Sequence, residues 1–400
     1  MCSINNYSKE YLGFEELDVN KVTLINGFKH LYVSTTIQAQ ECPECHKLAY
    51  KSKGYGRERL IQGLEVCGYP CILHYKPKRL RCSCGKTFSV ISPDIPGQSR
   101  LTHDKKNKIY KDLALKISMR EVARLNNVEL TYVMYLLDKV SYEVDQIGKI
   151  FCIDEFKGNL GGEKYQAVTI NPITNKVTNI YPSRKKSLLQ SEFAKIPRTK
   201  RENVEFFICD MWDTYIDLAK VFFRNATIVI DRFHYTKAIT TAFDSVRKRI
   251  QDQLSDDLRK CFKRSRFLLL KRTSELIHDD KKNEPLKVSI MLGCKYELEK
   301  AYKLLQKMYD FNDSTSVEEA RHKLINLIYA CYDSKIPEFE TAAKTLQKYS
   351  EYILNSFKTP YTNSYAEGKN TLLKTLKRIG FGYHNRERFL KRIMHIENYR

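Results

Sequence analysis

The sequence predicts a mixed α/β core, in which helices flank a central sheet, together with a long helical segment. Three observations support this fold class. Five short apolar runs have the length and composition of strands, at residues 150–153, 165–170, 176–181, 205–209 and 226–230. The second and third runs flank a turn typical of a hairpin, and a helical pattern over 214–223 joins the last two. Three meandering strands followed by strand–helix–strand indicate a mixed sheet covered by helices.

The net charge of +22 and the pI near 9.3 indicate a polyanionic partner. DNA is the first candidate and an anionic membrane surface the second, while a charge that serves only solubility is the alternative. No apolar run approaches the roughly 20 residues that span a bilayer. Residues 1–10 lack the apolar core of a signal peptide. We therefore expect a cytoplasmic, nucleoid-associated protein without a membrane partner, whose cysteines stay reduced.

A cysteine-rich segment predicts a structural Zn²⁺ site. Six of the twelve cysteines lie between residues 42 and 84, and in a reducing compartment such crowding favours metal over disulfides. Two short-spaced pairs supply the four soft donors that tetrahedral Zn²⁺ needs. These donors are Cys42, Cys45, Cys82 and Cys84. Four buried thiols without a metal are the alternative. The unplaced cysteines and reserve histidine ligands are Cys67, Cys71, His46 and His74.

A capped helix, a turn and a second helix follow at residues 118–140. Ser118 and Glu121 fit a capping box at the start of the first helix, and the second helix has a regular apolar face. The pattern favours a helix-turn-helix, whose recognition helix meets base edges near its start. An ordinary helical hairpin is the alternative. The residues expected to contact DNA are Thr131, Tyr132 and Tyr135.

Three carboxylates stand at the ends of predicted elements. Asp154 and Asp210 each follow an apolar strand, and Glu367 lies at the start of the last predicted helix, residues 364–379. Two metal ions that cut a phosphodiester need carboxylates from separate elements converging on one point. Each residue also has an ordinary explanation, as a turn residue, a helix cap or part of a capping box. Asp231 is the main rival for the site, and the weaker rivals are Glu155, Asp213 and Asp217.

The last predicted helix has a polar face that suits phosphate contacts. Residues three or four positions apart lie on one face of a helix, and amide and ammonium groups follow Glu367 at this spacing. The DNA-binding residues expected on this helix are Asn370, Lys374, Lys377 and Arg378.

At these residues the chain resembles the insertion-sequence transposases of the ISL-three family. The most specific blocks are Asp231-Arg232-Phe233-His234 and the Glu367-Gly368-x-Asn370 motif. The resemblance implies an RNase H-like core with a DDE triad, and the triad maps onto Asp154, Asp210 and Glu367. It also implies two Mg²⁺ or Mn²⁺ ions, hydrolysis at the terminal inverted repeats, and attack of the freed 3′-OH on target DNA. Asp231, Arg232 and His234 are then expected beside the metal ligands, with Arg232 on a phosphate or in a salt bridge.

The resemblance also implies an order of parts along the chain. A zinc ribbon and a helix-turn-helix domain precede the RNase H-like core, which a helical insertion divides in two. The expected ranges are 1–95 for the ribbon, 102–146 for the helix-turn-helix, 147–240 and 356–400 for the core, and 241–355 for the insertion. Joining two element ends suggests a homodimer or a larger assembly. The alternatives are a non-catalytic DNA-binding regulator derived from a transposase and another RNase H-like nuclease, such as a junction resolvase.

Overall fold

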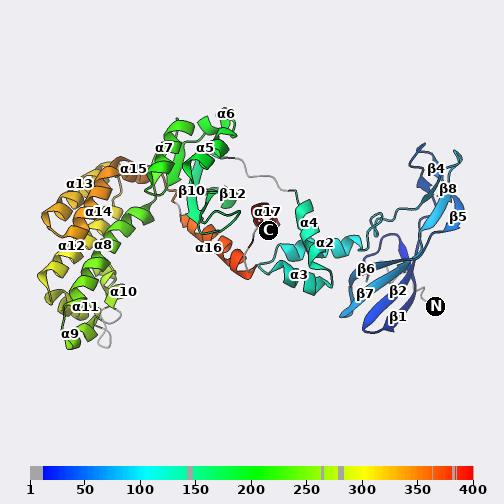
Figure 1. Ribbon diagram of the computed structural model, residues 1–400, viewed down its shortest axis with the longest axis horizontal. Helices are drawn as coiled ribbons and strands as arrows, with labels where there is room; N and C mark the ends of the chain where they lie inside the picture. Colours follow the sequence, from blue (N-terminus) through cyan, green and yellow to red (C-terminus); the bar gives the residue numbers. More distant parts are fainter. Residues whose placement is uncertain are drawn as a thin grey trace. The chain divides into compact units, whose positions relative to one another are not determined.

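The computed structural model describes residues 12–141, 147–262, 265–277, 283–362, 364–380, 383 and 385–399. The side chains of residues 261 and 364–367 lie outside this description. The chain forms two compact units (Figure 1). The N-terminal unit comprises Met1–Tyr142, Ile379–Phe381 and Lys391–Arg400, and the C-terminal unit comprises Glu143–Arg378 and Gly382–Leu390.

A four-stranded sheet opens the N-terminal unit, in the order β1-β2-β7-β6. Its strands are β1 (Leu17–Ile25), β2 (Phe28–Thr35), β6 (Arg59–Val66) and β7 (Tyr69–Tyr75). Asn26 and Gly27, with φ of 51° and 78°, form the tight turn between β1 and β2, a conformation that favours Asn-Gly. Leu31 and Leu73 are among the buried residues of this sheet. The sequence predicted a zinc ribbon over residues 1–95 without this sheet, so the sheet is an addition to the predicted ribbon.

The cysteine-rich part forms two small antiparallel sheets beside the first one. They contain β3 (Gln40–Glu41) with β4 (Leu48–Ala49), and β5 (Lys51–Tyr55), β8 (Lys78–Arg81) and β9 (Thr87–Ser89). Leu80 and Val90 pack against Cys42 and Cys82 in one small core.

Three short helices complete the N-terminal unit: α2 (His103–Leu113), α3 (Met119–Asn126) and α4 (Leu130–Lys139). The Ser118 hydroxyl accepts a hydrogen bond from the Glu121 N–H and so begins α3. Asn127, in the left-handed region with φ of 53°, ends it. The predicted apolar face of the second helix is buried and includes Val133, Leu136 and Leu137.

A further helix, α17 (Arg386–Asn398), follows the one predicted to be last, so that prediction was wrong. Its residues from Lys391 onward belong to the N-terminal unit. The fully buried Arg392 donates to the carbonyl oxygens of Leu115 and Ile117, at 2.9 and 3.1 Å. These bonds satisfy carbonyl groups in the segment between α2 and α3.

All five predicted strands are present in the sheet of the C-terminal unit, in the order β12-β11-β10-β13-β14. They are β10 (Ile150–Phe156), β11 (Gln166–Asn171), β12 (Lys176–Ile180), β13 (Phe206–Cys209) and β14 (Thr227–Ile230). The first three run antiparallel to one another, and β10, β13 and β14 run parallel. Because parallel strands point the same way, the carboxyl ends of β10, β13 and β14 meet at one edge of the sheet.

Helices α5 (Lys186–Ala194), α6 (Arg198–Glu202) and α7 (Asp213–Phe222) accompany this sheet. Phe151, Phe193, Phe207 and Phe223 interlock at ring-centroid distances of 4.7–5.8 Å in the shared core. Only α7 had been predicted, at 214–223.

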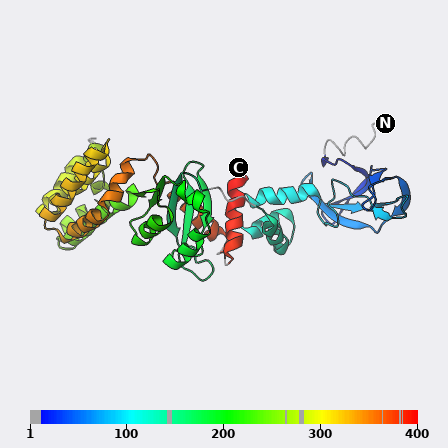
Figure 2. The same cartoon turned by 90° about the horizontal axis from the view of Figure 1, so that it is seen from above.

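The long segment after β14 is helical, as predicted, and its yellow and orange helices pack side by side (Figure 1, Figure 2). It contains α8 (Arg232–Asp252), α9 (Asp256–Cys261), α10 (Ser265–Leu269), η1 (Thr273–Glu275), α11 (Glu284–Gly293), α12 (Tyr296–Asn312), α13 (Val317–Asp333), α14 (Pro337–Lys348), α15 (Ser350–Leu354) and η2 (Asn355–Phe357). Helix α16 (Ser364–Ile379) then returns to the sheet. None of the helices in the described parts of the chain combines the length and apolar character that a bilayer crossing requires.

Candidate active site

Two aspartates and a histidine meet at the edge of the large sheet. Asp154 lies in β10, Asp210 directly follows β13, and His234 lies in the first turn of α8. One potential ligand atom of each lies within 4.8 Å of the other two. His234 Nε2 is 2.8 Å from Asp210 Oδ1. The sequence predicted both aspartates as metal ligands and His234 as a residue beside them, and the structure places His234 against Asp210.

The electrostatics of this cluster favour a bound cation. Burial, together with the nearby charge of Asp210, raises the pKa of Asp154 to about 7. Burial alone would lower the pKa of His234, but the hydrogen bond to Asp210 and the surrounding carboxylates outweigh it, so this pKa is raised. Two crowded carboxylates that are partly removed from water are stabilised by a positive charge between them.

Asn370 connects helix α16 to the cluster. Its Nδ2 donates to Asp154 Oδ2 at 2.6 Å, across 216 positions of sequence, and its side chain is buried. Its Oδ1 is also buried and has no hydrogen-bond partner within the described part of the chain. An unpartnered amide oxygen beside two carboxylates suits a hard cation or one of its water ligands. The sequence predicted Asn370 as a DNA contact, and the structure places it against Asp154.

Glu367 lies in α16, three residues before Asn370. Its backbone is helical, and its side chain falls outside the described residues. The predicted role of Glu367 is therefore a proposal, which we take up below.

A cleft of about 570 Å³ surrounds the cluster. Lys374 lines it, together with the rival Asp231 and with Arg232. Lys377 instead lies 3.5 Å from the Lys157 carbonyl oxygen, and Arg378 is exposed on α16. The weaker rivals bind cationic partners, since Glu155 pairs with Arg184, Asp213 with Lys348 and Asp217 with Lys186.

The predicted zinc ligands form a second cluster, in the N-terminal unit. One sulfur atom of each of Cys42, Cys45, Cys82 and Cys84 lies within 4.8 Å of the others. Cys42 and Cys84 are 3.7 Å apart and Cys45 and Cys82 are 3.5 Å apart, measured between Sγ atoms. Tetrahedral Zn²⁺ with Zn–S bonds of about 2.3 Å separates its sulfur ligands by about 3.8 Å. The four thiols therefore fit a structural zinc ion.

The other sulfur and imidazole candidates lie outside this cluster. Cys67 is exposed in the turn between β6 and β7, and Cys71 is buried in β7. A ring nitrogen of His74 lies 2.8 Å from a ring nitrogen of His30. His46, which directly follows the ligand Cys45, has a positive φ.

Comparison with known proteins assigns the chain to a family. A family model for transposases of the ISL3 (ISL-three) group matches residues 151–393, more than half of the chain. The chain belongs to the ISL3 family of transposases. A second model, for the zinc-finger of transposases IS204, IS1001, IS1096 and IS1165, matches residues 38–84. The transposase of insertion sequence element IS1001 from Bordetella parapertussis is 25% identical over 373 residues, which cover 91% of this chain and 90% of that relative.

In this ISL3 transposase, two of the three predicted DNA-reading residues of α4 border a second cleft, of about 890 Å³, in the N-terminal unit. Tyr132 and Tyr135 of α4 line it beside Arg124 and Lys106, whereas Thr131 is exposed and lies outside the lining. Membership of the transposase and zinc-ribbon families implies that the chain binds DNA.

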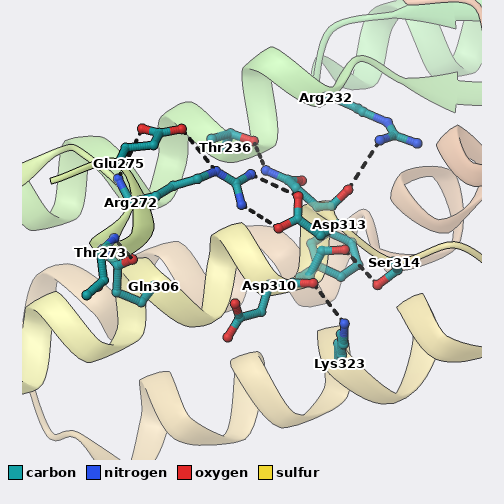
Figure 3. Close-up of polar contacts among 12 residues, drawn as sticks. Arg232, Thr236, Arg272, Thr273, Glu275, Gln306, Asp310, Asp313, Ser314 and Lys323 are labelled. Carbon is teal, nitrogen blue, oxygen red and sulfur yellow. Dashed lines mark hydrogen bonds and ion pairs between the residues drawn. The ribbon is translucent and has the colours of Figure 1, made fainter. Parts of the chain in front are cut away.

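Arg232, expected on a phosphate or in a salt bridge, reaches the helical segment that follows β14 (Figure 3). Its guanidinium donates to the carbonyl oxygens of Asn312 and Ser356, at 3.4 and 3.2 Å, and stacks on Phe357 at 4.4 Å. Asn312 Nδ2 also donates to Thr236 of α8, at 3.0 Å, and the neighbouring Asp313 pairs with Arg272.

Asn355 completes the junction. Its buried amide donates to the Ile228 carbonyl oxygen of β14 at 2.8 Å, and Tyr235 of α8 lies 3.3 Å from the Ser356 hydroxyl. We call the contacts of Arg232, Tyr235, Asn312, Asn355 and Ser356 the insertion clamp. The clamp joins the start of α8, which carries His234, to η2, the element that precedes α16 along the chain. No motif in the sequence indicated it.

Proposed function

We propose that this transposase cuts and joins DNA strands in the cleft of the C-terminal unit, with divalent cations bound by Asp154, Asp210 and Glu367. The observation that carries the proposal is the convergence of Asp154, Asp210 and α16 on one cleft. Glu367 precedes Asn370 by three residues on α16, a spacing that favours one shared helix face. A carboxylate on the face that already contacts Asp154 would complete a triad.

The proposed fold of this core is RNase H-like. The sheet order supports it, because three antiparallel strands are followed by two strands parallel to β10. A shared fold does not itself imply shared chemistry, so the activity rests on the side chains of the cleft.

Mg²⁺ or Mn²⁺ fits the hard oxygen donors of this cluster, and when bound it would neutralise charge on the reacting phosphate and activate the attacking oxygen. In the hydrolytic step, a water oxygen bonds to phosphorus at an element end, the P–O3′ bond breaks, and the leaving 3′ oxygen takes up a proton. In strand transfer, that 3′-OH oxygen bonds to a target phosphorus and the target's own P–O3′ bond breaks. The number of phosphodiester bonds is unchanged in the second step, so it needs no nucleotide cofactor.

The residues around the carboxylates would position them. The hydrogen bond from Asn370 orients Asp154, and the contact with His234 orients Asp210. Lys374, an ammonium group in the cleft wall, suits the DNA phosphate. Holding the reacting groups in a fixed geometry supplies much of the rate of such reactions.

The N-terminal unit would recognise the terminal inverted repeats. We propose that α3 and α4 form a helix-turn-helix and that Tyr132 and Tyr135 approach base edges from α4. The ribbon would be held by its four thiols. The four parts of the chain would have the ranges given above, except that residues from Lys391 onward group with the N-terminal unit. Bringing two element ends together requires at least a homodimer.

The test is a cleavage and strand-transfer assay on DNA that carries the element's own ends, with Mg²⁺ present. We expect Asp154→Asn, Asp210→Asn and Glu367→Gln each to lose activity while binding the same DNA. Asp333→Asn, the same change at an exposed residue of α13, is the matched control and should remain active. Equal activity in the wild type and Asp154→Asn would overturn the proposed mechanism.

A further inference from the structure

The three-stranded sheet of the ribbon carries a group of exposed cations that neither metal cluster uses. They lie on β5 and β8, and we call them the ribbon cationic face: Lys51, Lys53, Arg79 and Arg81. In the part of the chain that the structure describes, none of them takes part in an ion pair, a side-chain hydrogen bond or a cation–π contact. An unpaired group of cations is a candidate interaction surface.

The sheet geometry puts the two arginines on the same side. Arg79 and Arg81 flank Leu80, which is fully buried in the ribbon core. Successive side chains of a strand point to opposite faces, so both arginines point away from that core. Residues two apart on a strand are separated by about 6.6 Å, close to the spacing of successive phosphates along one DNA strand.

Like charges lie directly opposite each other across this sheet. Lys51 pairs in register with Arg81, and on the other side Arg79 and Arg81 face Ser89 and Thr87. Like charges at opposed positions destabilise a sheet. Glu44, the carboxylate between the ligands Cys42 and Cys45, pairs instead with Lys86, at 3.2 Å. An external anion would relieve this repulsion.

Protection of a sheet edge does not explain the arrangement. Lysines on an edge strand commonly prevent sheets from associating, and this reading suits Lys51 and Lys53 because β5 is an edge. Arg79 and Arg81, however, lie on β8, the central strand. Exposed aromatic rings accompany the cations, since Tyr50 and Tyr55 are 77% and 63% exposed.

We propose that the ribbon cationic face binds the phosphate backbone of duplex DNA without reading its sequence. Rows of lysine and arginine that neutralise phosphates give affinity without base specificity. The proposal rests on the proposed function, because it takes the DNA of the transposition reaction as its partner. It assigns to the ribbon a role separate from base reading by α4.

The test compares two variants of the full chain that lose the same charge. The face variant carries Lys51→Gln, Lys53→Gln, Arg79→Gln and Arg81→Gln. The control carries Lys287→Gln, Lys307→Gln, Arg321→Gln and Lys344→Gln, four exposed cations of the helical insertion that lack ion pairs within the described residues. Fluorescence anisotropy with a duplex of arbitrary sequence gives the affinity as a function of salt, without Mg²⁺.

Four lost phosphate contacts should reduce the slope of log K against log salt by about 3.6. We expect the face variant to bind at least about tenfold more weakly near 0.1 M salt, and the control to bind like the wild type. Equal losses in both variants would show a general effect of net charge and overturn the proposal, as would no loss in either.

Two further measurements keep the outcome clear. Zinc content must stay at the wild-type level, because loss of zinc would mean that the cations stabilise the thiolates instead. The double variant Lys53→Gln/Arg79→Gln, which changes no residue next to a cysteine ligand, should lose about half of the slope change. If the wild type binds duplex DNA through this face but cuts no element ends, the proposed function fails while this inference stands.

Discussion

The thiol cluster of the ribbon and the carboxylate cluster of the cleft are assembled differently. The four sulfurs come from two pairs that are local in sequence, and they complete a coordination shell without other ligands. Asp154, Asp210 and His234 come from three separate parts of the chain, and all three line one cleft. A closed soft-donor site serves folding, whereas an open site of mostly oxygen donors leaves positions for water and phosphate.

Selective metal removal should separate the two clusters and give the largest effect. Brief treatment with EDTA should abolish strand cleavage completely, and added Mg²⁺ should restore it. Prolonged treatment with a zinc-selective chelator should unfold the ribbon, because structural Zn²⁺ contributes about 10–16 kcal/mol in zinc-finger peptides. Metal content and circular dichroism follow both losses.

The matched variants for this comparison are Cys84→Ser and Cys67→Ser, both at exposed cysteines. Only Cys84→Ser should lose zinc. If Mg²⁺ alone restored activity and zinc content after the prolonged treatment, the proposed difference between a structural zinc cluster and a catalytic cluster would be contradicted.

Replacement of Asn370 should sharpen the assignment of the open cluster. We expect Asn370→Ala to lower strand cleavage about 10- to 100-fold, as the loss of a partner of a metal ligand commonly does. The Mg²⁺ concentration for half-maximal activity should rise, while DNA affinity should stay unchanged because Asn370 is buried against Asp154.

Lys374→Ala is the contrasting variant, since Lys374 lines the cleft without touching Asp154 within the described contacts. It should weaken DNA binding and leave the Mg²⁺ requirement alone. If Asn370→Ala weakened DNA binding and left the Mg²⁺ requirement unchanged, Asn370 would have the DNA-contact role that the sequence predicted.

The insertion clamp should have a moderate effect on stability. Asn355→Ala removes the buried hydrogen bond to the Ile228 carbonyl oxygen, which should lower the free energy of unfolding of the C-terminal unit by about 1–3 kcal/mol. Chemical denaturation measures it. Asn225→Ala removes a similar bond at an exposed site, 3.0 Å to the Glu202 carbonyl oxygen, and should cost less. An equal decrease in the free energy of unfolding in the two variants would contradict a special role for the clamp.

The smallest effect concerns pH and the N-terminal unit. Burial lowers the pKa of His395, whose Nε2 lies 2.7 Å from the Tyr110 carbonyl oxygen. Near pH 6.5 the unfolded chain therefore protonates this histidine more readily than the folded unit does. The free energy of unfolding keeps its full value above that pH and falls as the pH drops below it. Thermal unfolding of wild type and His395→Phe between pH 7.5 and pH 5.5 checks this; a wild-type curve no steeper than the variant's would contradict it.

The sequence predicted much of the core because its signals are local. Short apolar runs between turns marked each strand of the large sheet, and the predicted strand ends marked Asp154 and Asp210. The expected end at Asp154 was wrong, because β10 continues to Phe156, whereas Asp210 does follow β13 directly. The pairing of Asn370 with Asp154 spans 216 positions, so no local pattern could indicate it. The contact of His234 with Asp210 likewise depends on how β13 and α8 pack.

The N-terminal sheet was missed for a different reason. Asn26-Gly27 is a strong hairpin signal between apolar residues, but the closely spaced cysteines that follow favour a zinc ribbon for the whole segment. Arg232 was expected on a phosphate or in a salt bridge, but its guanidinium instead donates to the carbonyl oxygens of Asn312 and Ser356.

The insertion clamp also bears on how this part of the chain can change over time. Arg232 and Ser356 lie 124 positions apart yet are in contact. The helices between them therefore form one long excursion of the chain whose two ends meet at this contact. Closing a loop costs only about 0.6 kcal/mol more for each doubling of its length. Related transposases could therefore have longer, shorter or different helices in this segment without a change in the positions of His234 or α16, provided that the contacts of the insertion clamp were kept.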